Sequence, residues 1–307
     1  TVDILMNGTK LPAVLGATVP KRNTGELKTN GWELSFKWKD QLSNGIRYDI
    51  GLVLSDYQSE VIKFSGNPNK LLSSLYDGMK MGEIWGYETV GILQESDFTV
   101  DENGKYTLIG PSQTKIQSTI YPGDVRYADL DGDGEITKGD ETVDNPGDRK
   151  IIGNSTPRFH YGITGNISWK NFDLNIFFQG IAKRDVWISD NVFWGGSGTA
   201  GNWEMYNNSW TPEHTDAKYP MYAGRISSIQ QTGYLFNGAY LRLKTLALGY
   251  TLPREWTNKV KLSTVRLSLS GYNLFEISQI PDLYDPDQIS SSYPMMRSVA
   301  FGLQVGF

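Results

Sequence analysis

The sequence predicts an all-β, antiparallel transmembrane β-barrel, or a large part of one, with long extracellular loops. Apolar and polar residues alternate with a period of two along several segments, as in half-buried strands. The links between these segments are alternately short and long, which is typical of outer-membrane barrels. Aromatic residues make up 12% of the chain, and several stand at segment ends, like the interfacial girdles of such barrels. No apolar run approaches the roughly 18 residues that a membrane helix needs.

The clearest alternation runs over 158–169 and continues, after a tight Lys170-Asn171 turn, over 172–181. We expect a hairpin here, with Phe177 as an exception to the alternation. One face of its first strand should meet lipid and the other should face the lumen. The expected lipid-facing residues are Phe159, Tyr161, Ile163 and Ile167, and the expected lumen-facing residues are His160, Thr164 and Asn166.

Further strands are expected at 32–39, 47–56, 264–275 and 298–307. The segment 239–250 alternates less well, because Leu246 and Leu248 fall on its polar phase. Segments 1–8 and 83–93 are additional candidates for strands. We expect no helix longer than a few turns.

The short or moderate links lie at 41–46, 170–171 and 251–263, and the long ones at 61–157, 182–238 and 276–297. If the strand that ends at Phe307 runs toward the periplasm, strand parity places the three long loops outside the cell. A soluble β-sandwich or solenoid is the alternative, although small polar residues on the second face suit a wet lumen better than a dry core.

Charge and composition exclude several classes of function. The net charge is −5, which argues against a nucleic-acid partner bound through phosphate contacts. Cysteine is absent, and the two histidines, His160 and His214, cannot make a His-rich metal site. No paired acid and base, nucleophile motif or phosphate-binding loop is recognisable, so we expect neither catalytic nor cofactor-binding residues and predict that the protein is not an enzyme.

The segment 129–140 has the spacing of an EF-hand-type calcium loop. Asp129, Asp131 and Asp133 occupy positions 1, 3 and 5, and Gly134 stands where such a loop turns sharply. Glu135 would contribute its backbone oxygen, and Asp140 takes the twelfth position in place of the usual Glu. Calcium prefers these hard oxygen ligands, so we expect a structural Ca²⁺ site. A solvated, metal-free acidic turn is the alternative.

The long loop 182–238 is rich in aromatic residues. Flat rings can stack on sugars or pack against a partner protein, or they can form a small core of the loop itself. The possible substrate or partner contacts are Trp194, Trp203, Tyr206 and Trp210.

Several motifs, in the right order, resemble the SusC/RagA-type TonB-dependent outer-membrane transporters. The run 239–253 resembles the family's strand ending in LGY-x-LP, and 267–275 resembles its strand ending in NLF. The block 121–137, with Pro157 and Gly162, resembles its PGD…Y…DL…DG segment. The remaining matches are Gly31-Trp32-Glu33-Leu34, Asp285-Pro286, Tyr293-Pro294 and the terminal Phe307.

The resemblance implies that 1–307 forms the C-terminal part of a large plugged barrel in the bacterial outer membrane. The plug and the TonB-contacting segment are not recognisable in this chain. The implied function is energised import of oligosaccharides or peptides. The implied partners are a SusD-like surface lipoprotein, the remaining barrel and plug, the TonB complex and membrane lipid. The alternative is a secreted calcium-binding, carbohydrate-associated β-protein that acts as a binding module.

Overall fold

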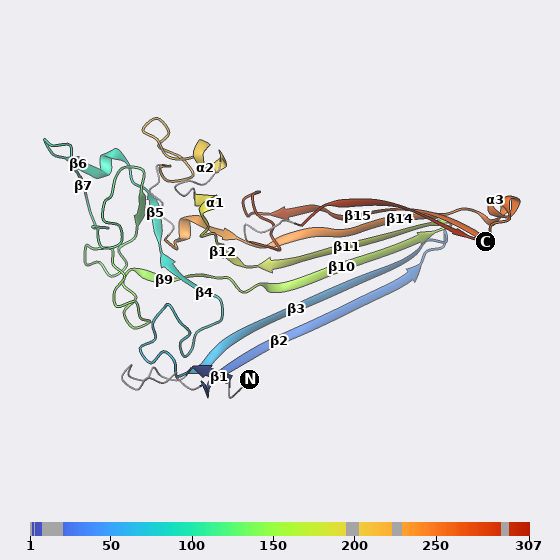
Figure 1. Cartoon of the computed structure of the whole chain (residues 1–307), viewed down its shortest axis with the longest axis horizontal. Coiled ribbons are helices and arrows are strands. Elements are labelled where there is room, and N and C mark those ends of the chain that lie inside the picture. Colours follow the sequence, from blue (N-terminus) through green and yellow to red (C-terminus); the bar gives the residue numbers. More distant parts are fainter. Residues whose placement is uncertain (1, 3, 8–20, 195–202, 223–228, 290–294) are drawn as a thin grey trace. The chain divides into compact units, whose positions relative to one another are not determined.

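The computed structural model describes residues 2, 4–7, 21–194, 203–222, 229–289 and 295–307 (Figure 1). The chain divides into two compact units. The sheet unit comprises Asn30–Gln58, Pro157–Arg184 and Asn237–Phe307, and the loop unit comprises Thr1–Thr29, Ser59–Thr156 and Asp185–Phe236.

The main sheet has eight strands in the order β1-β2-β3-β10-β11-β14-β15-β16, so its long strands are neighbours in chain order. Their bounds are Ile4–Asn7 (β1), Lys21–Gln41 (β2), Arg47–Phe64 (β3), Arg158–Trp169 (β10), Phe172–Lys183 (β11), Tyr240–Thr251 (β14), Thr264–Ser278 (β15) and Ser298–Gly306 (β16). The pairings from β3 to β16 are antiparallel. The strands β3, β10, β11, β14 and β15 exceed the 9–11 residues or so that a tilted strand needs to cross a bilayer, and β16, with nine, just reaches that length. Every strand expected with alternating faces is therefore found.

The register places the apolar residues of successive strands in rows on one face of the sheet. Because neighbouring residues of a strand point to opposite faces, the adjacent row belongs to the other face. The first row is Tyr48, Ile167, Leu174, Leu248, Leu269 and Phe301. The adjacent row is Asp49, Asn166, Asn175, Ala247, Ser270 and Ala300.

The apolar face stays uncovered within the sheet unit. Ile163 is 38% exposed, Leu269 is 51% exposed and Phe301 is 71% exposed. On β2 the alternating Trp32, Leu34, Phe36 and Trp38 are each at least half exposed. A dry two-sheet core, which would have buried Ile163, is therefore absent from the described part of the chain.

A pair of β-bulges explains the weak alternation of 239–250. The pairing of β14 with β11 gains one residue, Lys244, between Leu243 and Thr245, because Phe178 pairs with Leu243 and Phe177 with Thr245. On the other side, β15 accommodates the shift around Asn273, which has a positive φ of 52°. Beyond Lys244, Leu246 and Leu248 return to the apolar rows. The interpretation that these two leucines belong to the polar phase is thus corrected, because a bulge shifts the phase by one residue.

The links at one end of the long strands are short. The β2–β3 turn is closed by a hydrogen bond from the Gly45 N–H to the Leu42 carbonyl, 2.9 Å long. The β10–β11 turn is the expected Lys170-Asn171 pair, with Lys170 at φ 54°. The third link holds two short helical turns that the sequence did not predict, α3 (Arg254–Thr257) and η4 (Asn258–Val260). Figure 1 shows α3 and the C-terminus at this same end of the long strands.

The loop unit is built from short hairpin-like pairs rather than from structureless chain. Strand β4 (Glu83–Tyr87) pairs with β9 (Arg149–Asn154), and β5 (Thr89–Ile92) pairs with β8 (Val125–Tyr127). Strand β6 (Phe98–Val100) pairs with β7 (Tyr106–Leu108), and β12 (Asp185–Trp187) pairs with β13 (Leu235–Asn237). The expected strand at 83–93 is therefore two strands, β4 and β5.

The helical elements of the loop unit are short, as expected. They are η2 (Glu95–Asp97), α1 (Asn191–Trp194), α2 (Trp203–Asn207) and η3 (Thr232–Tyr234). Leu93, Phe98 and Ile120 form a buried core, on which Tyr106 and Leu108 pack. Within the described ranges, no helix is both long and apolar enough to cross a membrane.

The two faces of β10 should respond differently to an added charge. We expect Ile163→Arg to destabilise the full-length protein in lipid vesicles by about 2–4 kcal/mol if Ile163 lies near the bilayer midplane. The neighbouring Thr164→Arg, on the polar face, should cost far less. Denaturant titration of the vesicle-embedded protein measures both values. Equal costs would contradict the assignment of the faces.

Candidate functional site

Three carboxylates lie close together in the segment between β8 and β9, which we call the acidic loop. Oxygen atoms of Asp129, Asp131 and Asp148 all lie within 4.8 Å of one another. Asp148 is fully buried, and its two oxygens accept the N–H groups of Leu130 and Thr137, both at 2.7 Å. Sequence reasoning missed Asp148 because it lies beyond the twelve-residue spacing. The signal was the Asn145-Pro146-Gly147-Asp148 turn that follows.

The other expected ligands lie outside this group of three. The Asp133 carboxylate accepts the N–H of Glu135 at 2.7 Å, and the Asp140 carboxylate accepts the side-chain amide of Asn145 at 2.9 Å. Gly134 has a φ of 85°, a left-handed conformation that suits the expected sharp turn. Ile136, fully buried, anchors the loop, and its N–H donates to the Ser112 carbonyl at 2.7 Å.

The electrostatics of this group favour a cation. The hydrogen bond from the Asp133 N–H lowers the pKa of Asp131, but desolvation and repulsion by Asp133, Asp148 and Asp129 outweigh it, so the pKa of Asp131 is raised. A hard divalent cation would relieve this repulsion, and three carboxylates are the oxygen donors that Ca²⁺ accepts. The donor set therefore fits the expected metal.

The aromatic residues of 182–238 divide into buried and exposed sets. Trp194 is 2% exposed, packs edge-on against Phe193 and Tyr234, and donates its indole N–H to the Ile188 carbonyl at 2.6 Å. It belongs to a core of the loop unit, so the expectation that it contacts a substrate is corrected. Trp203 and Tyr206 on α2 are 74% and 56% exposed and pack edge-to-face at 5.7 Å.

Trp210 lines a cavity of about 430 Å³. Its ring lies against the backbone of Gly123, where a Cβ would come within 2.6 Å of the ring, and its indole N–H donates to Gln94 at 2.9 Å. Gly123 has a φ of 90° and makes room for the ring, and Pro122 beside it lines the cavity. The other lining residues are Glu95, Tyr106, Tyr121, Pro212 and Met221.

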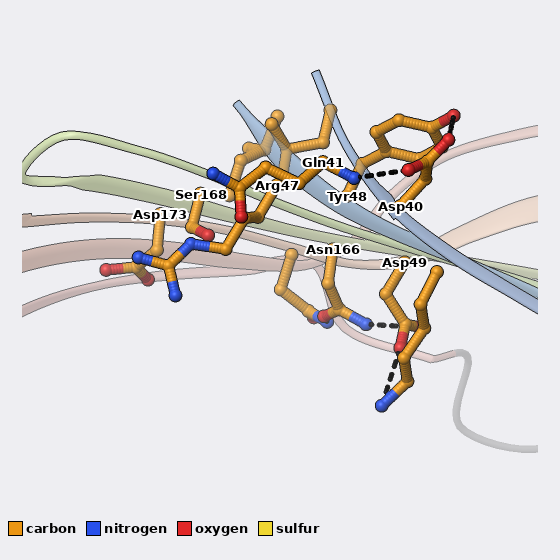
Figure 2. A pocket seen from close by; sticks show the side chains of 12 residues that line it. Asp40, Gln41, Arg47, Tyr48, Asp49, Asn166, Ser168 and Asp173 are labelled. Atoms are coloured by element: carbon orange, nitrogen blue, oxygen red, sulfur yellow. Dashed lines mark hydrogen bonds and ion pairs between the residues drawn. The ribbon is translucent and has the colours of Figure 1, made fainter. Parts of the chain in front are cut away.

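The polar face of the sheet unit carries paired charges and amides. Asp49 lies 3.2 Å from Lys37 and 3.3 Å from Lys39, and it accepts a hydrogen bond from Asn166. Asn175 donates in turn to Asn166 at 2.7 Å. Lys39, Asp49, Asn166 and Asn175 line a pocket of about 560 Å³ close to the short turns. Figure 2 shows Asp49 with Asn166 and, separately, Asp40 bonded to Gln41 and Tyr48.

A buried arginine holds the loop after β15 onto β14. The Arg242 side chain is 1% exposed and lies 2.8 Å from Asp285 and 2.9 Å from Asp287. Tyr240 also donates its hydroxyl to Asp287. Burial raises the pKa of Asp285, but the Arg242 guanidinium outweighs it, so the pKa is lowered. This ion-pair cluster therefore brings together two of the motifs, 239–253 and Asp285-Pro286, which are far apart in sequence.

These features define the class of protein. The antiparallel sheet has one uncovered apolar face and one face with charged and hydrogen-bonded side chains. Short turns join its strands at one end. This is the organisation of a transmembrane β-barrel wall. Two of the long links between the other ends of these strands are the folded loops of the loop unit.

No protein-family model matches the chain. Three curated relatives are TonB-dependent receptors of Formosa agariphila. Receptor P3 is 31% identical over 97% of the chain, receptor P26 is 24% identical over 100%, and receptor P39 is 23% identical over 100%. The chain spans 30%, 32% and 33% of their respective lengths.

Solved structures share the fold over the whole chain. One of the RagAB peptide transporter has a TM-score of 0.67 at 19% identity, and one of the RagAB peptide importer in the open-open state has 0.69 at 20%. The chain covers 32% and 31% of those chains. The SusC/RagA-type resemblance and the barrel fold are confirmed: over its whole length the chain is a relative of TonB-dependent receptors, and within the described residues it forms an open part of the barrel sheet.

The Arg242 cluster predicts how firmly the loop after β15 is held. Arg242→Met leaves Asp285 and Asp287 without their cation, and losing one partner of a buried pair typically costs about 3–5 kcal/mol. We expect chymotrypsin to cleave at Tyr284, which is buried in the wild type, while Arg266→Met, whose partner is Asp173, leaves that site protected.

The same cluster sets a pH dependence. Because the pKa of Asp285 is lowered in the folded state, its contribution is fully present above the unfolded value, about 3.9, and is lost as the pH falls through the lowered value. In the wild type, the loop after β15 should therefore resist cleavage at neutral pH and lose that resistance only in that acidic range, where pepsin, which is active in acid, replaces chymotrypsin. If chymotrypsin cleaved Arg242→Met at Tyr284 no faster than the wild type, Arg242 would not be what holds the loop after β15.

Proposed function

We propose that this chain forms barrel wall and extracellular loops of a TonB-dependent importer in the bacterial outer membrane. The observation that carries this proposal is the two-faced sheet, whose apolar rows need lipid and whose polar rows need water. Whole-length similarity to TonB-dependent receptors supports it. The cargo is an oligosaccharide or a peptide too large for a simple porin.

The other parts of the importer are formed by polypeptide other than residues 1–307. The remaining barrel closes the sheet, a plug gates the lumen, and the TonB complex supplies energy through a plug-side segment. A SusD-like surface lipoprotein covers the extracellular mouth. The RagAB structures, named as a peptide transporter and importer, support such a two-component arrangement and a peptide cargo. An oligosaccharide cargo is supported as well. The exposed rings of Trp203 and Tyr206 and the cavity lined by Trp210 suit stacking on sugar rings.

We further propose that the acidic loop binds a structural Ca²⁺ ion. Asp129, Asp131 and Asp148 hold it, with Asp133 and the Glu135 carbonyl next along the loop. Asp140 instead braces the loop through Asn145. The ion neutralises the carboxylates and fixes the turn between β8 and β9. Because extracellular Ca²⁺ is plentiful, an affinity on the order of 10⁻⁴–10⁻³ M suffices.

Energised import is tested with the full-length receptor in its native membrane. Deleting the receptor should abolish uptake of its cargo, and restoring it without the TonB-contacting segment should leave uptake at the level of the deletion. The measurement is uptake of radiolabelled oligosaccharide and peptide mixtures by intact cells. Uptake that does not depend on that segment would indicate a passive pore.

The calcium proposal predicts a local loss of order. Asp131→Ala, or chelation of the wild type, should increase protease cleavage within 121–150 while the barrel stays folded. Asp144→Ala removes a nearby exposed carboxylate outside the three-carboxylate group and is the matched control. Calcium titration of protease protection measures the affinity. Protection that is identical with and without calcium would mean that the acidic loop is metal-free.

A further inference from the structure

At the end with the short turns, the apolar face of the sheet unit finishes in a row of aromatic rings. Trp169 pairs with Phe172, and Phe172 pairs with Tyr250, so the three side chains share one face of the sheet. It is the apolar face, because Trp169 stands two residues after Ile167 on β10. The Phe172 and Tyr250 ring centroids are 4.5 Å apart, and Trp169 is 42% exposed. Rings so placed are typical of the layer where hydrocarbon gives way to lipid headgroups.

The tight turn between β10 and β11 places a cation beside these rings. Because the turn has only two residues, Lys170 follows Trp169 directly, and its positive φ of 54° bends the chain back. The Lys170 ammonium lies 4.6 Å from the centroid of the Trp169 ring, within range for a cation–π contact. Since Trp169 points to the apolar face, this charge lies on the lipid side of the turn.

The link between β14 and β15 lies next to this turn. Asn171 donates its side-chain amide to the Thr251 carbonyl at 2.6 Å, and its own carbonyl accepts the Thr251 N–H at 2.9 Å. Figure 1 shows α3, which belongs to this link, at the end of the long strands. The link contains three cations and one acid, which are Arg254, Lys259, Lys261 and Glu255. With Lys170, four cations and one acid stand on the turn and the link together.

The link also exposes apolar side chains. Trp256 is 58% exposed, and Val260, about one helical turn further on, is 64% exposed. The backbone that carries them is held in place, because Thr257 is buried and its carbonyl accepts the Leu262 N–H at 3.0 Å. A short helical segment with exposed apolar side chains beside lysines suits a membrane interface, where the rings reach the acyl chains and the ammonium groups reach the headgroups.

The neighbouring parts of a closed barrel would leave this region open to lipid. Further strands would pair with the edge strands β1 and β16, and a plug would lie on the polar side. The lipid side of β10, β11 and β14 therefore stays uncovered. Asp173, which follows Phe172, points to the polar face and forms an ion pair with Arg266, so its charge is already neutralised there.

We propose that the short-turn end of the sheet unit is a binding site for an anionic phospholipid. The headgroup phosphate lies beside Lys170 and the cations of the link, and the acyl chains lie along the aromatic row. The excess of positive charge favours a headgroup with a net negative charge, such as phosphatidylglycerol, over zwitterionic phosphatidylethanolamine. This inference rests on the proposed membrane function and goes beyond it, because it assigns a lipid partner that sets the level of the turns in the bilayer.

The test uses the full-length receptor, purified in detergent and freed of lipid, with an equimolar mixture of dioleoyl phosphatidylglycerol and dioleoyl phosphatidylethanolamine. The two lipids share their acyl chains, so the ratio in which they bind, measured by native mass spectrometry, reports the headgroup alone. We expect the wild type to retain more phosphatidylglycerol. Lys170→Gln should lower that ratio about fivefold, the usual contribution of one basic residue beside an anionic lipid. Adding Lys259→Gln and Lys261→Gln should abolish the preference.

A matched control removes the same charge elsewhere. The triple variant Lys80→Gln, Lys105→Gln and Lys115→Gln, in the loop unit, should bind the two lipids in the wild-type ratio. All six lysines are exposed, so both triple variants should keep the melting temperature of the wild type.

The outcomes separate the lipid site from import. Equal retention of the two lipids by the wild type would overturn the site. An equal loss of preference in both triple variants would also overturn it, because the effect would then come from net charge alone. In either case import would stand if uptake by intact cells still required the TonB-contacting segment. Uptake without that segment would refute the proposed function instead, and the lipid ratio would still decide the site.

Discussion

The register of the long antiparallel strands is the constraint on which the other features depend. In lipid, backbone N–H and C=O groups find no water, so they must be paired between strands. That pairing allows little freedom, because a slip of one residue would exchange the apolar and polar faces of a whole strand. The rows that run from Tyr48 to Phe301 and from Asp49 to Ala300 exist only because successive pairings agree. Each hairpin turn therefore fixes the chemistry of two faces at once.

The bulges at Lys244 and Asn273 show how the sheet departs locally from this rule while keeping its faces consistent. An inserted residue in β14 would reverse the faces of everything beyond it if the neighbouring sequence kept its phase. The leucines of β14 change phase at that point, so Leu243 and Leu246 both fall in apolar rows. On the polar side, Arg242 lies two residues before Lys244 and binds the carboxylates of Asp285 and Asp287 in the loop after β15. A strand irregularity and a buried ion-pair cluster thus occupy neighbouring positions.

The loop unit relies on a different source of stability. Its strands are three to six residues long, too short to be stable alone, and buried side chains connect them. The fully buried Gln113 amide donates to the Val125 carbonyl and accepts the Tyr127 N–H, so one side chain completes the edge of β8. The aromatic core around Phe193 and Trp194 has the same role in the second long loop. Rings that appeared available for recognition in the sequence are partly needed to fold the loop that carries them.

The sequence by itself determined the strands, their faces, the tight turns and the family resemblance, because a period of two, turn residues and short motifs are local properties of a chain. It also brought Asp129 and Asp131 together, since they lie two residues apart in a turn. Only the tertiary structure decided which side chains from distant segments meet. It added Asp148 to the carboxylates, buried Trp194, paired Arg242 with Asp285, and placed Phe177 over Gly162. These contacts depend on register and loop packing across tens of residues, which no local pattern specifies.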